Sequence, residues 1–363
     1  MRILRVIALL ALSSCSFAQT FSVVYTFKGY PNDAGNPYGG VVRDKSGNLF
    51  GVSLGGGTHA KGAIYKITPT GEESVLHSLT TGQGDLPFDR LTLDPAGNLY
   101  GTAGYGGFAD NGTVFEWKHS GEFAVLHRFG QGNYQDGTNP CAGVVIDAEG
   151  NLYGTAPYAG PFNNGAVYKI TPDGHESVLY GFGAAVDGSF PQAPLLKAHD
   201  GSFYGTTALS GTAGYGTVFK LTPDGVETLL YNFQGYEDGR NPAGKLAEDG
   251  EGNLYGTTSA GGSTGQGVLF KIDRHGKETV LFDGIGVVLG GLVIDPQGNL
   301  YGADSGGVFK VDPLGNYTQL YVFSPGSLAH DSPILAADGN LYGATYSGGD
   351  PDCDCGIVYK ITL

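Results

Sequence analysis

The feature that most constrains this chain is a five-residue phrase, Gly-Asn-Leu-Tyr-Gly or a close relative, which occurs seven times. Successive copies begin 50, 53, 51, 51, 46 and 41 residues apart. The copies begin at Gly47, Gly97, Gly150, Gly201, Gly252, Gly298 and Gly339. Such a period is typical of one supersecondary unit repeated along a chain, so a repeat architecture is expected whatever the activity.

Each repeat contains four short segments that read as strands. An apolar run such as residues 143–147 precedes the phrase, a Gly-x-Val-Phe-Lys segment such as residues 216–220 follows it, and a fourth run such as residues 227–231 comes after a Thr-Pro-x-Gly turn. Short runs rich in Val, Ile, Leu, Tyr and Phe, bounded by Gly, Pro, Asp and Asn, indicate strands joined by tight turns. No segment beyond the N-terminal leader shows sustained helical periodicity with caps, so almost no helix is expected.

Four strands per unit at this spacing predict an all-β fold, a seven-bladed β-propeller. The last unit ends at Leu363 without its fourth strand, and a matching segment stands at the other end of the chain, from Phe21 to Phe27. The N-terminal strand is therefore expected to close the last blade, which pairs two edges that would otherwise be free to aggregate. An open solenoid would need capping units, and neither end resembles one.

The first residues read as a secretory signal. Arg2 and Arg5 form a basic region, residues 6–12 an apolar run, and residues 16–18 a small-x-small cleavage site. We expect residues 1–18 to be a signal peptide, residues 19–363 a single propeller domain, and the protein to be secreted, periplasmic or on the cell surface. In the alternative, residues 12–15 act as a lipobox and Cys15 carries a lipid anchor. The apolar run is too short to span a bilayer, and no transmembrane segment follows it.

The charge balance bears on partners. The formal net charge is −15, and removal of residues 1–18 takes away two basic residues and no acidic ones, leaving −17. A strongly acidic surface repels phosphate backbones, so nucleic acid is not expected as a partner. A soluble monomer is expected, since high acidity favours solubility.

Three cysteines follow the leader. Cys141 opens an innermost strand and reads as a small buried residue. Asp352, Cys353 and Cys355 lie in an unusual acidic loop that could hold a metal or could be a local disulfide staple. The Cys pair has only one residue between its members and no second pair, so the ligand set is incomplete, and no cofactor is expected.

Loop tyrosines are the strongest candidates for a binding face. They lie in the loops that join blades and in those between the second and third strands, which surround one mouth of a propeller. Exposed rings with polar tips suit stacking on sugars or peptides, although any one of them could simply pack on a neighbouring loop. The ligand-binding candidates are Tyr30, Tyr105, Tyr134, Tyr158, Tyr215, Tyr236 and Tyr346. The Tyr within the repeated phrase is instead explained by packing, because it recurs in every blade.

A second recurrent element is Asp-Gly-x-x-Pro in the links between blades, beginning at Asp136, Asp187 and Asp238, with a variant at Asp33. A ring of carboxylates at one mouth could hold Ca²⁺. Ordinary turn chemistry, in which the Asp accepts hydrogen bonds from nearby backbone, is the favoured interpretation.

The search for catalytic motifs is mostly negative. The sequence has no Gly-x-Ser-x-Gly elbow, no His-Glu-x-x-His and no phosphate-binding Gly loop with Lys. His59, His330 and Asp350 fall in loops of neighbouring blades, with Asp331 nearby in sequence, and are weak catalytic candidates whose relevance depends on convergence at one rim.

The compound repeat resembles the GloVer tandem repeat of bacterial exported proteins. The copies at residues 252–258, 216–225 and 278–281 carry the resemblance most clearly, and it covers nearly all of residues 21–363. The resemblance implies an exported, propeller-like repeat protein, often attached to the surface by a C-terminal anchor, with no established activity and no catalytic residues to transfer. Because this sequence ends inside a predicted strand without such a tail, we expect a soluble or lipid-tethered version of these proteins.

Together these observations favour a binding or interaction module for a glycan or peptide at the loop-lined mouth. A lyase or hydrolase acting at the propeller rim and an envelope scaffold without a small ligand are the alternatives, because the fold does not choose among them.

Overall fold

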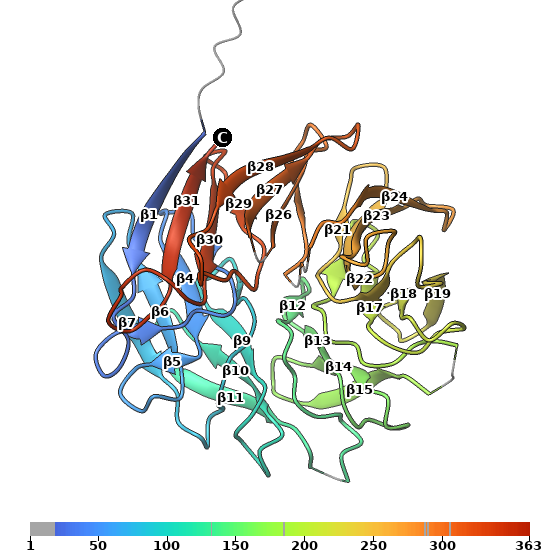
Figure 1. The fold of residues 1–363 in the computed structure, drawn as a ribbon. Coiled ribbons are helices and arrows are strands. Elements are labelled where there is room, and N and C mark those ends of the chain that lie inside the picture. The colour runs from blue at the N-terminus through green and yellow to red at the C-terminus, as the bar shows by residue number, and fades with distance from the viewer. Residues whose placement is uncertain (1–18, 132, 184–185, 287, 289, 305) are drawn as a thin grey trace, which may run out of the picture.

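The computed structural model describes residues 19–363 apart from 132, 184–185, 287, 289 and 305. The described residues form strands and turns and contain no helix. Seven antiparallel sheets are arranged in a ring (Figure 1), which confirms the predicted seven-bladed β-propeller. The leader at residues 1–18, with the proposed cleavage site and Cys15, lies outside the described residues.

The blades share one pattern, with strands following one another outward from the axis. The first strands are β3 (Val42–Arg43), β8 (Thr92–Leu93), β12 (Val145–Ile146), β16 (Leu196–Lys197), β21 (Ala247–Glu248), β25 (Val293–Ile294) and β29 (Ile334–Leu335). The second are β4 (Leu49–Ser53), β9 (Leu99–Ala103), β13 (Leu152–Ala156), β17 (Phe203–Thr207), β22 (Leu254–Ala260), β26 (Leu300–Asp304) and β30 (Leu341–Thr345). We number the blades 1 to 7 in this order.

The third strands are β6 (Ala63–Ile67), β10 (Thr113–Trp117), β14 (Ala166–Ile170), β18 (Thr217–Leu221), β23 (Val268–Ile272), β27 (Gly307–Val311) and β31 (Ile357–Thr362). The fourth are β7 (Glu73–Ser78), β11 (Phe123–Arg128), β15 (Glu176–Gly181), β19 (Glu227–Asn232), β24 (Glu278–Asp283), β28 (Tyr317–Val322) and β1 (Thr20–Thr26). Three short strands lie in loops: β2 (Ala34–Gly35) pairs with β5 (Gly55–Gly56), and β20 (Arg240–Pro242) pairs with β22.

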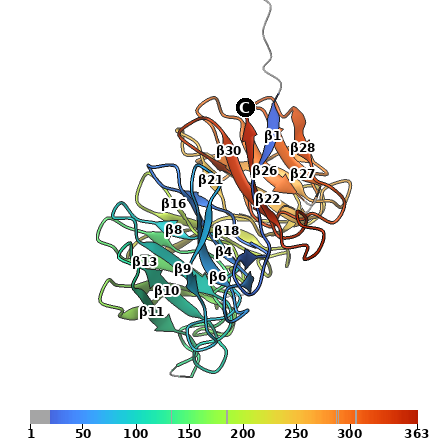
Figure 2. The ribbon, with the colours of Figure 1, turned by 90° about the vertical axis from the view of Figure 1, so that its left-hand side faces the viewer.

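The N-terminal strand closes the ring as predicted. β1 pairs antiparallel with β31, from Thr20 opposite Thr362 to Thr26 opposite Ile357. Figures 1 and 2 show this blue strand at the outside of the otherwise red last blade. Every fourth strand carries a bulge opposite the third strand, which increases local twist at the exposed edge.

The repeated phrase is explained by hydrogen bonding and packing within one blade. In blade 3, Asp147 accepts hydrogen bonds from the backbone and side-chain nitrogens of Asn151 at 2.8 Å and from the Tyr153 hydroxyl at 2.9 Å. The first Gly of the phrase, Gly150, takes φ = 84° in this turn, a conformation that favours glycine. The last, Gly154, lies under the ring of Tyr168, where a Cβ would approach the hydroxyl oxygen to 2.3 Å.

The blades meet one another at a position near the start of each fourth strand, which we call the junction slot. This residue faces a ring on the fourth strand of the preceding blade. The seven slot residues are Glu73, Phe123, Glu176, Glu227, Glu278, Tyr317 and Phe21. The slot therefore holds a carboxyl group in four blades and an aromatic ring in three.

At the four carboxyl junctions, the slot Glu meets a buried Asp from the preceding blade link. Between blades 3 and 4, Asp187 accepts a hydrogen bond from the Tyr180 hydroxyl at 2.8 Å. Burial, followed by the charge of Asp187, raises the pKa of Glu227 to about 7. The same arrangement joins Tyr25 and Asp33 to Glu73, His127 and Asp136 to Glu176, and Tyr231 and Asp238 to Glu278.

At the three ring junctions, the slot ring stacks on the preceding blade's ring. The centroids are 4.0 Å apart for His77 and Phe123, 4.8 Å for Phe282 and Tyr317, and 3.6 Å for Tyr321 and Phe21. Such pairs contribute about 0.5–1.5 kcal/mol beyond the burial of their area.

Candidate functional site

One pocket lies where the links into the blades converge on the axis of the ring. Its volume is about 310 Å³, at the lower end of the range for small-molecule sites. Its lining residues come from the segments that precede the first strands of all seven blades and from the loops between the second and third strands of blades 2 and 3. Segments from all seven blades can meet only around the central channel. We call it the mouth pocket.

Aromatic side chains form much of its wall. The aromatic lining residues are Tyr38, Phe88, Tyr105, Tyr158, Phe190 and His330. His330 stacks on Tyr38 with centroids 4.1 Å apart, and Phe88 packs edge-on against Tyr38 at 5.4 Å. On the other side, Tyr158 packs edge-on against Phe190 at 4.9 Å. Burial lowers the pKa of His330, so at neutral pH the imidazole is an uncharged aromatic surface.

Several polar groups of the wall have unused hydrogen-bonding capacity. Within the described part of the chain, the side chains of Tyr38, Tyr105, Tyr158 and Gln192 make no hydrogen bond. Asn139 donates to the Gly104 carbonyl at 2.9 Å and keeps its amide oxygen free. Burial first, then Cys141 and Asp89, raise the pKa of the Tyr38 hydroxyl, which therefore remains a donor. The pocket thus presents hydroxyl and amide groups between ring faces.

The floor of the mouth pocket carries two carboxylates and a thiol. Asp331 accepts a hydrogen bond from the Gly40 backbone at 2.7 Å and forms an ion pair with Arg90 at 2.8 Å, which joins blades 7, 1 and 2. Asp89 accepts from the backbone nitrogen of Gly143 at 2.7 Å. Burial, followed by Asp89, raises the pKa of the Cys141 thiol to about 11, so it is not a thiolate nucleophile at neutral pH.

The proposed binding tyrosines divide into three groups. Tyr105 and Tyr158 line the mouth pocket, and Tyr346 contacts its wall through Tyr38 at 5.9 Å and His330 at 5.5 Å. Tyr215 instead packs beneath Gly235 and beside the core of blade 5. The remaining tyrosines are exposed in blade links outside the pocket lining: Tyr30, Tyr134 and Tyr236.

The weak catalytic candidates do not meet in the described structure. His330 is part of the aromatic wall, while His59 is exposed and contacts Thr58. Asp350 accepts a hydrogen bond from the Asp352 backbone within its own loop at 2.8 Å. No hydrogen bond or ion pair joins the three within the described residues.

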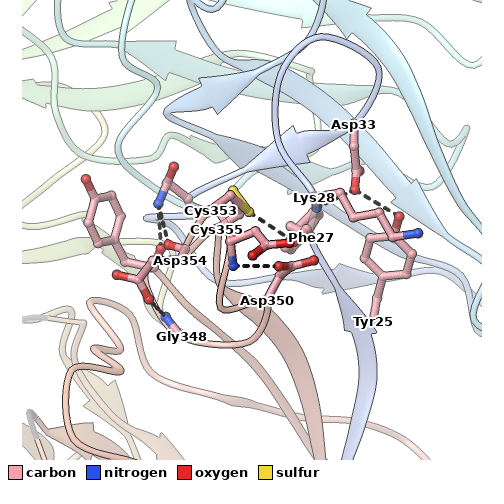
Figure 3. The surroundings of a disulfide bond; sticks show 12 residues. Tyr25, Phe27, Lys28, Asp33, Gly348, Asp350, Cys353, Asp354 and Cys355 are labelled. Atoms are coloured by element: carbon pink, nitrogen blue, oxygen red, sulfur yellow. Dashed lines mark hydrogen bonds between the residues drawn. A yellow bond between two sulfur atoms is a disulfide. The ribbon is translucent and has the colours of Figure 1, made fainter.

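The acidic cysteine loop closes on itself. Cys353 and Cys355 form a disulfide (Figure 3). The loop also contacts the segment leaving β1, since the Asn36 side chain donates to the Asp354 carbonyl at 3.1 Å and the Cys353 sulfur lies 3.7 Å from the Phe27 carbonyl. As bonded, the two sulfur atoms are not thiolates. Among the described residues, no group of three or more His, Cys, Asp or Glu side chains is arranged to hold a metal ion.

Several pocket residues that motif searching missed, among them Tyr38, Phe88 and Gln192, share one sequence signal. In six blades, three residues precede the apolar run of the first strand, and they differ from blade to blade although the repeat around them does not. They read Tyr-Gly-Gly at 38–40, Phe-Asp-Arg at 88–90, Cys-Ala-Gly at 141–143, Gln-Ala-Pro at 192–194, Ala-Gly-Lys at 243–245 and His-Asp-Ser at 330–332. Comparison of the repeats with one another would have found the pocket, because a variable position in a constant frame is free to serve a ligand.

Fold and site together define the class: a seven-bladed β-propeller with an aromatic pocket at one mouth of its channel. The chain belongs to the Gloeobacter/Verrucomicrobia repeat family, whose model matches residues 12–198 and 177–353. This confirms the resemblance seen in the repeats. No curated protein matched the chain in sequence.

Solved structures share the fold at low identity. The extracellular domain of a protein described as the hybrid two component system BT4673 from B. thetaiotaomicron superposes with a TM-score of 0.63 at 12% identity, over 94% of this chain and 39% of that one. A similar domain of BT3049 from the same organism gives 0.62 at 13%, over 94% and 41%. A protein from Bacteroides uniformis described as a 6-phosphogluconolactonase gives 0.54 at 18%, over 79% and 84%. The chain thus spans about two fifths of the two extracellular-domain chains that it resembles.

The part of the chain that the structure describes contains no helix long and apolar enough to cross a membrane.

Proposed function

We propose that this protein is an exported binding module that takes a small carbohydrate, such as the terminal residue of a glycan, in the mouth pocket. The observation that carries the proposal is the combination of aromatic ring faces with unpaired hydroxyl and amide groups around about 310 Å³. Sugars present apolar faces for stacking and hydroxyls for hydrogen bonds, so both parts of the wall are matched.

A peptide fits this pocket less well than a sugar. Extended peptides are commonly bound along a sheet edge or in a groove, whereas this pocket is small and is lined by loops from around the ring. Export is supported by the N-terminal leader pattern and by the extracellular origin of two structural neighbours.

The test is a glycan and peptide array, followed by calorimetry, on residues 19–363. Tyr158→Ala removes a wall ring and is expected to weaken binding about tenfold or more, that is about 1.4 kcal/mol. Tyr236→Ala removes a ring that is 83% exposed and outside the pocket, and it is expected to change nothing. Equal losses in both variants, or capture of peptides and no sugars, would reject the carbohydrate pocket.

A further inference from the structure

The charges at the mouth of the channel are arranged in two layers. The mouth pocket is lined by the carboxylates of Asp89 and Asp331, and no Lys or Arg is among its described lining residues. A smaller cavity of about 60 Å³ shares these two residues and is also lined by Arg90 and Lys245. In the triplet at residues 88–90 the acidic Asp89 precedes the basic Arg90, while Asp331 is the second residue of the triplet at 330–332 and Lys245 the third residue of the triplet at 243–245. The layers therefore form a dipole whose negative end faces the pocket.

Asp89 is the less neutralised of the two carboxylates. Asp331 has its ion pair with Arg90 at 2.8 Å, whereas Asp89 makes no ion pair within the described residues and relies on two backbone donors, Gly143 at 2.7 Å and Arg90 at 2.6 Å. Burial and then Asp331 raise the pKa of Asp89, and the two backbone donors and the nearby charge of Arg90 offset this only in part. Burial and then Arg90 lower the pKa of Lys245, while the charges of Asp89 and Asp331 act in the opposite direction.

The walls above Asp89 also favour a cation. Aromatic faces attract ammonium groups through the ring quadrupole, and His330 adds no positive charge when neutral. The acidic balance of the whole chain, −15, raises the local concentration of cations further. A sugar carboxylate would instead approach two carboxylates at close range.

We propose that the mouth pocket selects sugars that bear a protonated amine, with the sugar ring on the aromatic wall and the ammonium against Asp89. This rests on the carbohydrate-binding function proposed above. The ammonium supplies charge-assisted hydrogen bonds to Asp89, which makes no ion pair of its own within the described residues, and such bonds are stronger than those between neutral groups.

The test is calorimetry at pH 7 with methyl glycosides of glucosamine, N-acetylglucosamine, glucose and glucuronic acid. The wild-type protein is expected to bind the amine at least tenfold more tightly than its N-acetylated form and to bind the acid least. Asp89→Asn is expected to abolish that preference. Asp224→Asn removes the same formal charge from an exposed turn and is expected to keep it.

The outcomes distinguish a failure of this inference from a failure of the proposed carbohydrate binding. Equal binding of the amine, N-acetyl and neutral sugars, or tightest binding of the acid, overturns the inference and leaves carbohydrate binding intact. Failure of all these sugars, together with an array that finds no carbohydrate, overturns both. The wild-type panel decides the matter even if Asp89→Asn fails to fold. An equal loss of preference in Asp224→Asn would assign the effect to net charge and reject the role of Asp89.

Discussion

The carboxyl junctions and the ring junctions occupy the same place between neighbouring blades but hold it by different forces. In the first kind a buried Asp, a Tyr or His donor and a half-buried Glu meet, as in Tyr180, Asp187 and Glu227. In the second kind two rings stack, as in His77 and Phe123. The type of slot residue depends on the link between the two blades. The slot holds Glu where that link supplies a buried Asp hydrogen-bonded to the ring of the preceding fourth strand, and it holds an aromatic residue where the link does not. Seven equivalent interfaces can therefore be built from two compatible residue sets.

The largest effect is expected from removal of a ring at a ring junction. Phe123→Ala removes the stack on His77 and the contact with Phe115, whose centroid lies 5.5 Å away. We expect a loss of about 2–3 kcal/mol in the free energy of unfolding, below the value for a fully buried Phe because Phe123 is partly exposed. Urea denaturation followed by circular dichroism measures it. Phe123→Tyr keeps the ring and should stay within about 0.5 kcal/mol; similar losses in both variants would show that the stack contributes nothing.

The next effect distinguishes the junctions by pH. The pKa of the slot Glu is raised from an ordinary value of 4.5 to about 7 at Glu176, Glu227 and Glu278, and it is also raised at Glu73. Between these values the folded chain retains protons that the unfolded chain has released. The contribution of the protonated slot Glu residues to the stability of the folded state is therefore complete below about pH 4.5 and is lost as pH rises through their folded pKa values.

Glu73→Gln mimics the protonated group and should remove one junction's share of this pH dependence. We expect the free energy of unfolding of the variant, measured relative to that of the wild type, to be roughly 1 kcal/mol higher at pH 9 than at pH 5. This figure is reduced because solvent screens a half-exposed group. Glu72→Gln, at an exposed neighbouring position, is the control. Urea midpoints across pH 4–9 that are parallel for all three proteins would contradict the protonated carboxyl junction.

The smallest effect is expected from loss of the Tyr–Asp hydrogen bond at a carboxyl junction. Tyr231→Phe removes the donor to Asp238 at 2.8 Å and should cost about 0.5–1.5 kcal/mol. Tyr236→Phe removes a hydroxyl from an exposed ring a few residues away and should remain within about 0.5 kcal/mol. If the two variants unfold at the same urea concentration, the Tyr–Asp bond carries no net stability.

Much of the fold could be predicted because its evidence is local and repeated. The phrase at residues 150–154 finds its partners within its own repeat, with Asp147 just before it and the ring of Tyr168 over its last glycine, so each copy forms the same strand pair. The closing strand was predictable because one end of the chain lacks the segment that the other end supplies. The sequence analysis interpreted Asp136 and its equivalents as turn residues that accept hydrogen bonds from nearby backbone, which the structure shows for Asp136 and Gly130. It did not predict that Asp136 also lies near the slot residue of the next blade, Glu176.

The site was predicted less completely. Tyr105 and Tyr158 were identified from their loops, whereas Tyr38, Phe88, Phe190 and Gln192 were not. Tyr38, Phe88 and Gln192 open the variable triplets that precede first strands and lie 50 and 104 positions apart in turn, while Phe190 lies two residues before Gln192 and outside the triplet. Only closure of the ring brings them together, and it also separates Tyr30 and Tyr236 from Tyr158 although all lie in loops with similar composition.

The sequence by itself determined the number of blades, their strands and the way the ring closes, because hydrophobic period, turn residues and packing partners recur within each repeat. The tertiary structure decided which side chains share the mouth pocket, which carboxylates face it, and which slots pair Glu with Asp. These contacts join residues of different blades, and the distances between those residues depend on the rotation from one blade to the next.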